Sequence, residues 1–407
     1  MQRTAQYLAN LTPLRGIAAL LTVMFHVDLM IGNGGNALIK IKDSMVLTRM
    51  YLMVDFFFIL SGFIMCHVYN KWFEESVTTH QFKRFSIARF ARVYPMHFVT
   101  LLYTIFLFSI TAKLGIPNIP VLQVSNSGYS IATNLLLLHS MNMHNWFSWD
   151  HASWSISTEW WAYMVFPFLV KPMFRLKQVG IMTTVLLCFA GYLIITYFIV
   201  PLVTIPPEIP FVKIDPARLS VNVAYEFGFL RCLCGFILGM AVYQCYTAQF
   251  GKRILSNGYT FILFTAGLFT CMHFDLPDVF TIIFFPLLLL SGAYGSTNLN
   301  RFFATKPLQR LGDWSFSIYL VHQPLLFTLG AIMAYINPAD PNLKPTGPPP
   351  QPSMPVIWLI FIGFTILTLL VSYLTYNFIE VPARNWINGK NKKVMVAQTA
   401  INAGNFS

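Results

Sequence analysis

The chain has 407 residues, of which 56% are hydrophobic and only 10% are charged, and its mean hydropathy is +0.59. A soluble domain needs far more polar surface to cover its core, so this composition excludes one and predicts an all-α, polytopic membrane bundle. The formal net charge of +12 is expected to lie mostly in loops on one side of the membrane. The sequence does not show the basic patch interleaved with aromatic residues that is typical of nucleic-acid binding, so no nucleic-acid partner is predicted.

Ten apolar stretches are long enough for a helix to cross the bilayer, which takes about 20 residues. In chain order they cover 12–31, 47–69, 91–112, 152–171, 179–201, 222–246, 254–273, 278–296, 312–336 and 355–380. The weakly apolar stretch 129–140 is left open as an eleventh, short or re-entrant segment. The sequence therefore predicts about ten transmembrane helices in one membrane domain over residues 1–390, with a polar tail at 391–407.

The first stretch, LTPLRGIAALLTVMFHV, carries two polar groups that a membrane helix normally lacks. Arg15 and His26 lie on one helical face, eleven residues or about 16 Å apart. An ionisable side chain inside a membrane is costly and by default indicates function, although snorkelling to the membrane surface is an equal explanation for Arg15 alone. The stretch lacks a small-residue cleavage site, so we expect it to remain as the first helix.

Lys and Arg side chains predict the orientation, because they collect in cytoplasmic loops. With both termini in the cytoplasm, eighteen of these residues fall in the inner segments and seven in the outer ones. The sequence therefore predicts an integral protein of the plasma (cytoplasmic or inner) membrane with both termini cytoplasmic.

Further ionisable groups lie within the predicted helices. They are Asp55, Glu159, Glu226, Arg231, His322 and Glu380. Ser155 precedes Glu159 by four residues, so on a helix its hydroxyl shares the face of the carboxylate and is placed to hold it. Structural alternatives remain: Glu226 and Arg231, five residues apart, are expected to neutralise each other, and Asp55 suits a helix-positioning role near the outer interface.

The segment HQFKRFSIARFARVYPMHF carries a basic cluster of Lys83, Arg84, Arg89 and Arg92 just before the third helix. Guanidinium groups bind phosphate oxygens through paired hydrogen bonds, so this cluster suits a polyanionic cofactor that arrives from the cytosol. The alternative is a loop that contacts lipid head groups.

All six cysteines lie in or at the ends of predicted helices. Cys232 and Cys234 are two residues apart, so on a helix they point to different faces and do not suit one metal ion. We interpret the cysteines as apolar filler and predict no metal site.

Seven sequence blocks, taken in order, resemble one known family. They are LRGIAALLTVMFH, VDFFFILSGFI, RFSIARFARVYPMHF, SWSISTEWWAYMVFP, RCLCGFILGM, LGDWSFSIYLVHQPL and FIEVPAR. Together they are similar to the integral-membrane acyltransferase 3 family, whose members O-acetylate carbohydrates. The resemblance extends from residue 11 to about residue 384, and the family's expected membrane helices, about ten, agree with the number of apolar stretches.

The resemblance implies an O-acetyltransferase that takes an acyl group, usually acetyl, from acetyl-coenzyme A on the cytoplasmic side. The acceptor would be a hydroxyl of an extracytoplasmic or lipid-linked glycan, such as exopolysaccharide or lipopolysaccharide. The family's motif residues match Arg15 and His26 in the first helix, Arg89 and Arg92 before the third, and Ser155 and Glu159 in the Ser-x-x-x-Glu block. Many relatives carry an additional esterase-like domain after the membrane region, and this sequence shows none, so the chain is expected to be of the stand-alone type.

This chemistry gives the polar groups expected roles. Acyl transfer from a thioester needs a base for the hydroxyl proton, a donor for the developing oxyanion and a clamp for the carrier phosphates. His26 is expected to be the general base or a transient acyl acceptor, oriented by Glu159 or Asp55. The other expected site residues are Arg15, Arg84, Arg89 and Arg92 for the coenzyme A phosphates, and Ser155, Arg231 and His322 along the cavity.

Two other functions stay open on the residues alone. A proton-coupled secondary transporter would use the buried His, Asp and Glu groups as a relay, but no internal repeat or matching pair of broken helices is visible. A non-catalytic scaffold gives no reason to keep so many buried ionisable groups. The expected partners are therefore acetyl-coenzyme A, a glycan acceptor and the lipid bilayer, with no resident cofactor.

Overall fold

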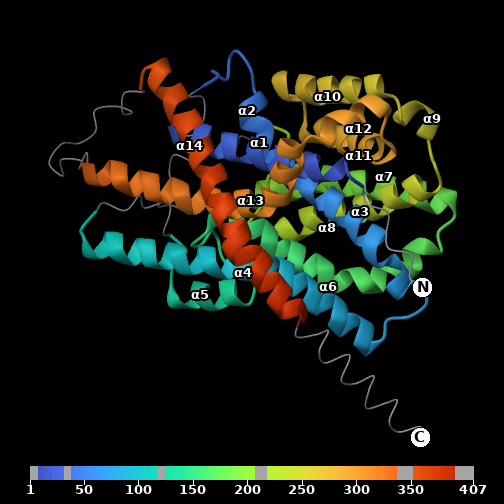
Figure 1. Ribbon diagram of the computed structural model, residues 1–407, viewed down its shortest axis with the longest axis horizontal. Coiled ribbons are helices and arrows are strands. Elements are labelled where there is room, and N and C mark those ends of the chain that lie inside the picture. The colour runs from blue at the N-terminus through green and yellow to red at the C-terminus, as the bar shows by residue number, and fades with distance from the viewer. Residues whose placement is uncertain (1–7, 32–37, 117–123, 207–217, 337–351, 390–407) are drawn as a thin grey trace, which may run out of the picture.

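Figure 1 presents a computed structural model of the chain, whose described residues are mainly helical. It describes residues 8–31, 38–116, 124–206, 218–336 and 352–389, and no strand occurs in these ranges. The predicted polar tail at 391–407 lies outside the described residues. The structure confirms the predicted all-α membrane bundle.

The helices follow one another along the whole described chain. They are α1 (Leu11–Ile31), α2 (Val46–Arg49), η1 (Met50–Leu52), α3 (Met53–Phe73), α4 (Thr79–Lys113), α5 (Gly128–Leu135), η3 (His151–Ser153), α6 (Trp154–Phe174), α7 (Gln178–Ile194), η4 (Ile195–Ile199), η5 (Val200–Leu202), α8 (Gly228–Thr247), α9 (Lys252–Leu255), α10 (Gly258–His273), α11 (Asp278–Tyr294), α12 (Thr297–Phe303), α13 (Lys306–Ile336), α14 (Met354–Thr375) and η6 (Tyr376–Glu380).

Each of the ten predicted stretches coincides with a helix, but fewer than ten of these helices qualify as spans. Within the described ranges, seven are long and apolar enough to cross a membrane, or eight if α11 and α12, bent by 94°, form one broken span. The helix α10 has only 16 residues, and α6 is not among the seven. The open eleventh segment is the short helix α5, with eight residues.

The central helices approach each other closely. The helix α1 packs along α13, and α3 packs along α8. Gly62 of α3 and Gly239 of α8 make the second contact possible: a Cβ atom on Gly62 would lie 1.9 Å from the Phe236 carbonyl oxygen, and one on Gly239 would lie 1.9 Å from the Ile59 carbonyl oxygen. Small residues at such a contact are typical of packed membrane helices.

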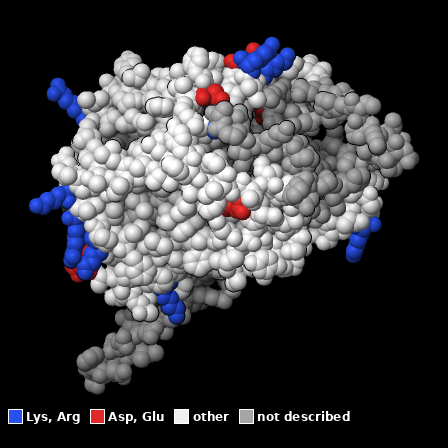
Figure 2. All heavy atoms as spheres, turned by 180° about the vertical axis from the view of Figure 1, so that it is seen from behind, with Lys and Arg blue, Asp and Glu red and all other residues white. Residues whose placement is uncertain are grey.

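The outer surface of the bundle suits lipid. Figure 2 shows a face on which charged side chains are sparse and lie largely near its edges. Large hydrophobic side chains are exposed on the peripheral helices, among them Leu186 on α7, Ile262 on α10 and Leu359 on α14. Such broad apolar exposure is rare in soluble proteins, so the chain is an integral membrane protein.

The long helix α4 connects the two ends of the bundle. It begins with a capping box in which the Thr78 hydroxyl accepts the Gln81 N–H, and it continues for 35 residues to Lys113. The prediction started this helix at residue 91, so the structure adds three turns, which carry Lys83, Arg84 and Arg89 of the basic cluster. In Figure 1, α5 lies beside α4, and α14 runs diagonally across α13 and α4.

Candidate functional site

Two adjoining cavities share Arg15, Arg89 and Arg92. The central cavity, of about 130 Å³, is lined by Arg15, Val54, Phe57, Phe58, Leu60, Ser61, Ile64, Met65, Arg89, Arg92, Val93, Ser155, Ile156, Glu159, Tyr163, Ser315, Phe316 and Tyr319. The basic cavity, of about 390 Å³, is lined by Arg15, Tyr69, Ala88, Arg89, Arg92, Asp313, Tyr376, Arg384 and Asn388. The arginines therefore stand where the two spaces meet.

Contacts from neighbouring helices hold two of these arginines in place. Arg89 donates from Nη2 to the Tyr69 hydroxyl at 2.7 Å, and its guanidinium lies 5.0 Å from the centre of that ring. Arg92 forms an ion pair with Glu380 of η6. The Glu380 carboxylate, which is 1% exposed, also accepts the Ser317 hydroxyl at 2.8 Å. Glu380 thus fixes Arg92 at the junction of the cavities.

Arg84 is placed differently from the other predicted phosphate ligands. Its side chain is exposed and stacks on Trp72, with 4.5 Å from the guanidinium carbon to the ring centre. It lines neither the central nor the basic cavity. The structure therefore brings Arg15, Arg89 and Arg92 together and leaves Arg84 outside the group.

Glu159 lies on the wall of the central cavity. Its Oε1 atom accepts the Ser61 hydroxyl and the Tyr163 hydroxyl, each at 2.5 Å. The predicted bond from Ser155 is not the one that forms: the Ser155 hydroxyl pairs instead with the Tyr319 hydroxyl at 2.7 Å. Two donors from α3 and α6 hold the carboxylate, while the Ser155–Tyr319 pair stands separately on the cavity wall.

His26 and His322 come together across the contact between α1 and α13. The Nε2 atom of His322 lies 3.2 Å from the Nδ1 atom of His26. Each Nδ1 atom also meets a backbone carbonyl: His26 meets the Thr22 oxygen at 2.9 Å and His322 meets the Tyr319 oxygen at 2.5 Å. The His322 ring also lies 5.8 Å from the ring of Tyr319, which lines the central cavity.

These hydrogen-bond partners indicate which ring nitrogen carries the hydrogen in each neutral histidine. A carbonyl oxygen only accepts, so Nδ1 carries the hydrogen in both rings. The bare Nε2 atom of His322 then accepts from His26 Nδ1, and the lone pair of His26 Nε2 is left to react. Among the described residues, the hydrogen-bond partners of His26 are Thr22 and His322, so neither Asp55 nor Glu159 orients it by direct contact.

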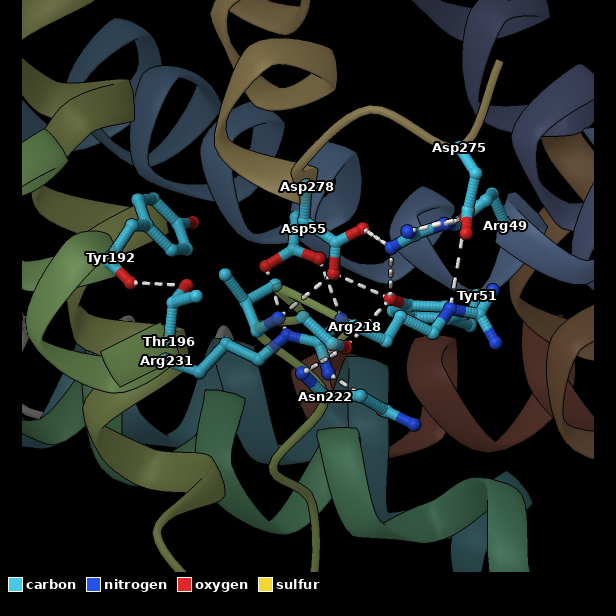
Figure 3. A network of polar contacts seen from close by, with 12 residues as sticks. Arg49, Tyr51, Asp55, Tyr192, Thr196, Arg218, Asn222, Arg231, Asp275 and Asp278 are labelled. Carbon is cyan, nitrogen blue, oxygen red and sulfur yellow. Dashed lines mark hydrogen bonds and ion pairs between the residues drawn. The ribbon is translucent and has the colours of Figure 1, made fainter. Parts of the chain in front are cut away.

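Asp55 and Arg231 form a fully buried ion pair, shown in Figure 3. Arg231 donates from Nε to Oδ1 at 3.0 Å and from Nη2 to Oδ2 at 2.6 Å. The expected pairing of Glu226 with Arg231 is wrong: the Glu226 carboxylate accepts the Thr204 N–H at 3.0 Å. Glu226 lies before α8, and Arg231 lies in its first turn. Phe227 between them has φ +58°, so the two residues are not spaced along one helix.

The same network continues toward Arg49, which is 1% exposed. Arg49 forms ion pairs with Asp275 at 2.5 Å and with Asp278. The Tyr51 hydroxyl donates to Asp278 at 2.5 Å. In Figure 3 these side chains gather into one cluster with the Asp55–Arg231 pair. Arg218, 3.7 Å from Asp275, adds a third arginine to match the three aspartates, which fits a structural role in joining α3, α8 and α11.

The sequence did not single out three polar residues that line the central cavity, or one buried acid near it. The lining residues are Ser61, Tyr163 and Tyr319, and the acid is Asp150. Tyr163 follows Glu159 by four residues, a spacing that places both on one helical face and that signals the contact. Asp150, in the connection before α6, is 1% exposed, and burial raises its pKa to about 7.

The family comparison agrees with the ordered sequence blocks. A family model described as an acyltransferase domain matches residues 8–377. No solved structure matches the chain.

Curated relatives cover most of the chain at low identity. The chain is 23% identical to the peptidoglycan O-acetyltransferase OatA of Listeria monocytogenes, over 94% of this chain and 57% of that protein. It is 20% identical to the putative peptidoglycan O-acetyltransferase YrhL of Bacillus subtilis, over 93% of this chain and 55% of that protein. The acyltransferase MdmB of Streptomyces mycarofaciens is 28% identical, over 77% of this chain and 78% of that protein. The chain spans little more than half the length of the first two relatives.

Proposed function

The chain belongs to the integral-membrane acyltransferase 3 family, and we propose that it is an O-acyltransferase that moves an acetyl group from acetyl-coenzyme A to a glycan hydroxyl. The acceptor is an extracytoplasmic or lipid-linked glycan. The names of OatA and YrhL support O-acetylation of a glycan. The proposed location is the plasma membrane, with both termini and the basic cavity on the cytoplasmic side.

One observation carries the proposal: three arginines stand where the basic cavity meets the central cavity. Guanidinium groups bind phosphate oxygens in paired hydrogen bonds, so the basic cavity suits the phosphates of coenzyme A. The thin pantetheine arm would then extend into the central cavity, whose walls are mostly apolar side chains such as Phe57 and Ile64. In this proposed pose the thioester would lie near Ser155 and Tyr319.

The chemistry of the transfer is assigned to Ser155 and Tyr319 on the cavity wall and to His26, which lines neither cavity and whose partner His322 packs against Tyr319. His26 Nε2 takes the proton of the glycan hydroxyl as its oxygen forms a bond with the acetyl carbon. The carbon–sulfur bond breaks, and the proton passes to the departing thiolate of coenzyme A. The Tyr319 and Ser155 hydroxyls, 2.7 Å apart on the cavity wall, are the proposed donors to the developing oxyanion. In the variant route, His26 Nε2 first bonds to the acetyl carbon as the carbon–sulfur bond breaks and the coenzyme A thiolate leaves. The glycan oxygen then takes the acetyl group from Nε2, and its proton passes to the thiolate.

The test is a transfer assay with purified protein in lipid nanodiscs. The substrates are labelled acetyl-coenzyme A and surface glycan from the same cells, freed of its esters by mild alkali. We expect the label to enter the glycan. Arg89→Ala should raise the KM for acetyl-coenzyme A by about tenfold or more, since a hydrogen bond to a charged group contributes about 1.5–3 kcal/mol.

Arg84→Ala is the matched control, because Arg84 is exposed and lines neither cavity. Its KM for acetyl-coenzyme A should stay within about twofold of the wild-type value, the size of a weak surface effect. Absence of label in the glycan, together with solute uptake by the same protein in vesicles, would contradict the acyltransferase proposal and favour a transporter.

A further inference from the structure

A third hollow lies on the other half of the bundle. This groove, of about 480 Å³, is lined by Val124, Ser125, Ser127, Tyr129, Asn142, Met143, His144, Asn145 and Glu226. Its volume is in the range of small-molecule binding pockets, about 300–1,000 Å³. It is formed by the residues before and in α5, the connection between α5 and α6, and the residues before α8.

The groove is far from the basic cavity. The end of α5 meets the middle of α4, where the Tyr94 hydroxyl donates to the Leu135 carbonyl at 3.0 Å, and Ile131, nearer the start of α5, lies in one hydrophobic cluster with Phe108. Sixteen residues of α4, or about 24 Å of helix, separate Phe108 from Arg92 at the basic cavity. Figure 1 shows α5 beside α4.

The charges of the groove differ from those of the other two cavities. No Lys or Arg is among the described residues that line it. Its one carboxylate, Glu226, is held by the N–H and hydroxyl groups of Thr204 at 3.0 Å and 3.3 Å. Burial lowers the pKa of His144, so this ring is neutral at pH 7. The groove therefore disfavours phosphates and other anions.

The remaining groups suit a ligand rich in hydroxyls. Tyr129 is 59% exposed, and its ring is braced edge-on by the His144 ring at 5.3 Å. Asn142 and Asn145 accept hydrogen bonds at their side-chain carbonyls, from Phe227 N–H at 2.8 Å and from the Ser125 hydroxyl at 3.4 Å. Their amide groups keep N–H donors to offer, and Glu226 is an acceptor. An exposed ring beside fixed amides and a carboxylate matches the apolar face and hydroxyl edge of a sugar.

The groove is also connected with the reaction centre by one short segment. The connection that supplies Asn142 and Asn145 leads directly into α6, and Ser155 at the start of α6 lines the central cavity. Asn142 also ties this connection to Phe227 at the start of α8.

We propose that this groove binds the sugar chain of the acceptor glycan, on the side of the bundle opposite the basic cavity. The inference rests on the proposed glycan O-acyltransferase function. The carbohydrate is neutral at the bound unit, and its reactive hydroxyl belongs to a neighbouring unit that extends toward Ser155 and Tyr319.

The test measures the two substrates separately in the nanodisc assay with the alkali-treated glycan as acceptor. Tyr129→Ala should raise the acceptor KM by about three- to tenfold, the loss expected for one aromatic contact, and leave the donor KM within about twofold. Tyr129→Phe keeps the ring and should behave like the wild type. Glu226→Gln should also raise the acceptor KM.

Tyr335→Ala is the matched control, because Tyr335 is an exposed tyrosine, 69% accessible, that does not line the groove. Its acceptor KM should not change. If the wild type transfers the label and the acceptor KM is unchanged in both Tyr129→Ala and Glu226→Gln, the groove does not bind the acceptor. The proposed acyltransferase function would then still stand. No transfer by the wild type would overturn both.

Discussion

The positions of the protons in the His26–His322 pair determine which nitrogen reacts. His26 Nδ1 faces two acceptors, the Thr22 carbonyl at 2.9 Å and His322 Nε2 at 3.2 Å. Both stabilise the positive charge that spreads over the His26 ring when Nε2 takes a proton or an acyl group. Under the proposed function, His322 would therefore act through His26 as a positioning residue, as the carboxylate of a catalytic triad does.

This role predicts a graded response at His322. His322→Phe removes the acceptor and should lower kcat about 100-fold, within the range for general-base catalysis. The KM values for both substrates should stay within about threefold, because His322 binds neither of them. His322→Gln restores an acceptor oxygen and should recover a large part of kcat. Steady-state kinetics of the purified variants measure both effects.

A purely structural role for His322 predicts a different pattern. Both variants would then lose folded protein in proportion to their activity. Equal loss of kcat in His322→Gln and His322→Phe, with matching losses of thermal stability, would contradict the positioning role.

The residues of the site were partly predictable because membrane burial makes polar groups conspicuous. Arg15, Arg89 and Arg92 were predicted to act together, and the structure brings them to one junction. Side-chain contacts between different helices were not predictable, because residue spacing within one helix does not show how that helix is aligned with its neighbour. Hence the Ser155–Tyr319 pair and the Asp55–Arg231 pair appear only in the structure. The catalytic roles of His26 and Glu159 stay predictions.

At the scale of helices, the α3–α8 contact positions one wall of the central cavity. Ser61, which holds Glu159, is next to Gly62 at this contact. On α8, Gly235 and Gly239 are four residues apart, the spacing of small residues that lets membrane helices approach. The Asp55–Arg231 ion pair joins the same two helices. The close glycine contact and the ion pair therefore both fix how α3 is aligned along α8.

The close approach predicts a large effect from one methyl group. In Gly239→Ala the new Cβ would lie 1.9 Å from the Ile59 carbonyl oxygen, so α3 and α8 must separate. We expect a loss of about 1–3 kcal/mol in stability, the cost of overpacking. Thermal unfolding of the detergent-solubilised protein measures it.

Gly363→Ala is the matched control within α14, where a Cβ would meet nothing within 4 Å. It should be neutral or stabilising, because Ala favours a helix over Gly by about 1 kcal/mol. Equal unfolding temperatures for the two variants would contradict the importance of the α3–α8 contact.

The length of the apolar stretches predicted the positions of the helices well. It predicted less well which of these helices are long and apolar enough to span the membrane. All ten stretches are helical, yet α10 is short and α11 ends at Gly295, whose φ of +67° starts the bend toward α12. The amphipathic start of α4 escaped an apolarity criterion altogether, since its first turns carry Lys83, Arg84 and Arg89. Its signal was the Thr78–Gln81 capping box.

At the scale of the whole molecule, the two ends of the bundle differ in charge. Four arginines line the basic cavity at one end, Arg15, Arg89, Arg92 and Arg384. The proposed acceptor groove toward the other end has a carboxylate and no Lys or Arg among its described lining residues. Under the proposed orientation, a phosphate-rich donor and a neutral glycan would approach from opposite sides of the membrane, with the central cavity between them.

This arrangement predicts opposite labelling of two exposed asparagines in intact cells. Asn145 lies in the groove, and Asn385 follows Arg384 of the basic cavity. A membrane-impermeant maleimide should label Asn145→Cys from outside and should label Asn385→Cys only after the membrane is opened. The wild-type chain is the control, because its six cysteines are buried or half-buried. The reverse pattern would invert the proposed topology, and labelling of both variants from outside would place both cavities on one side.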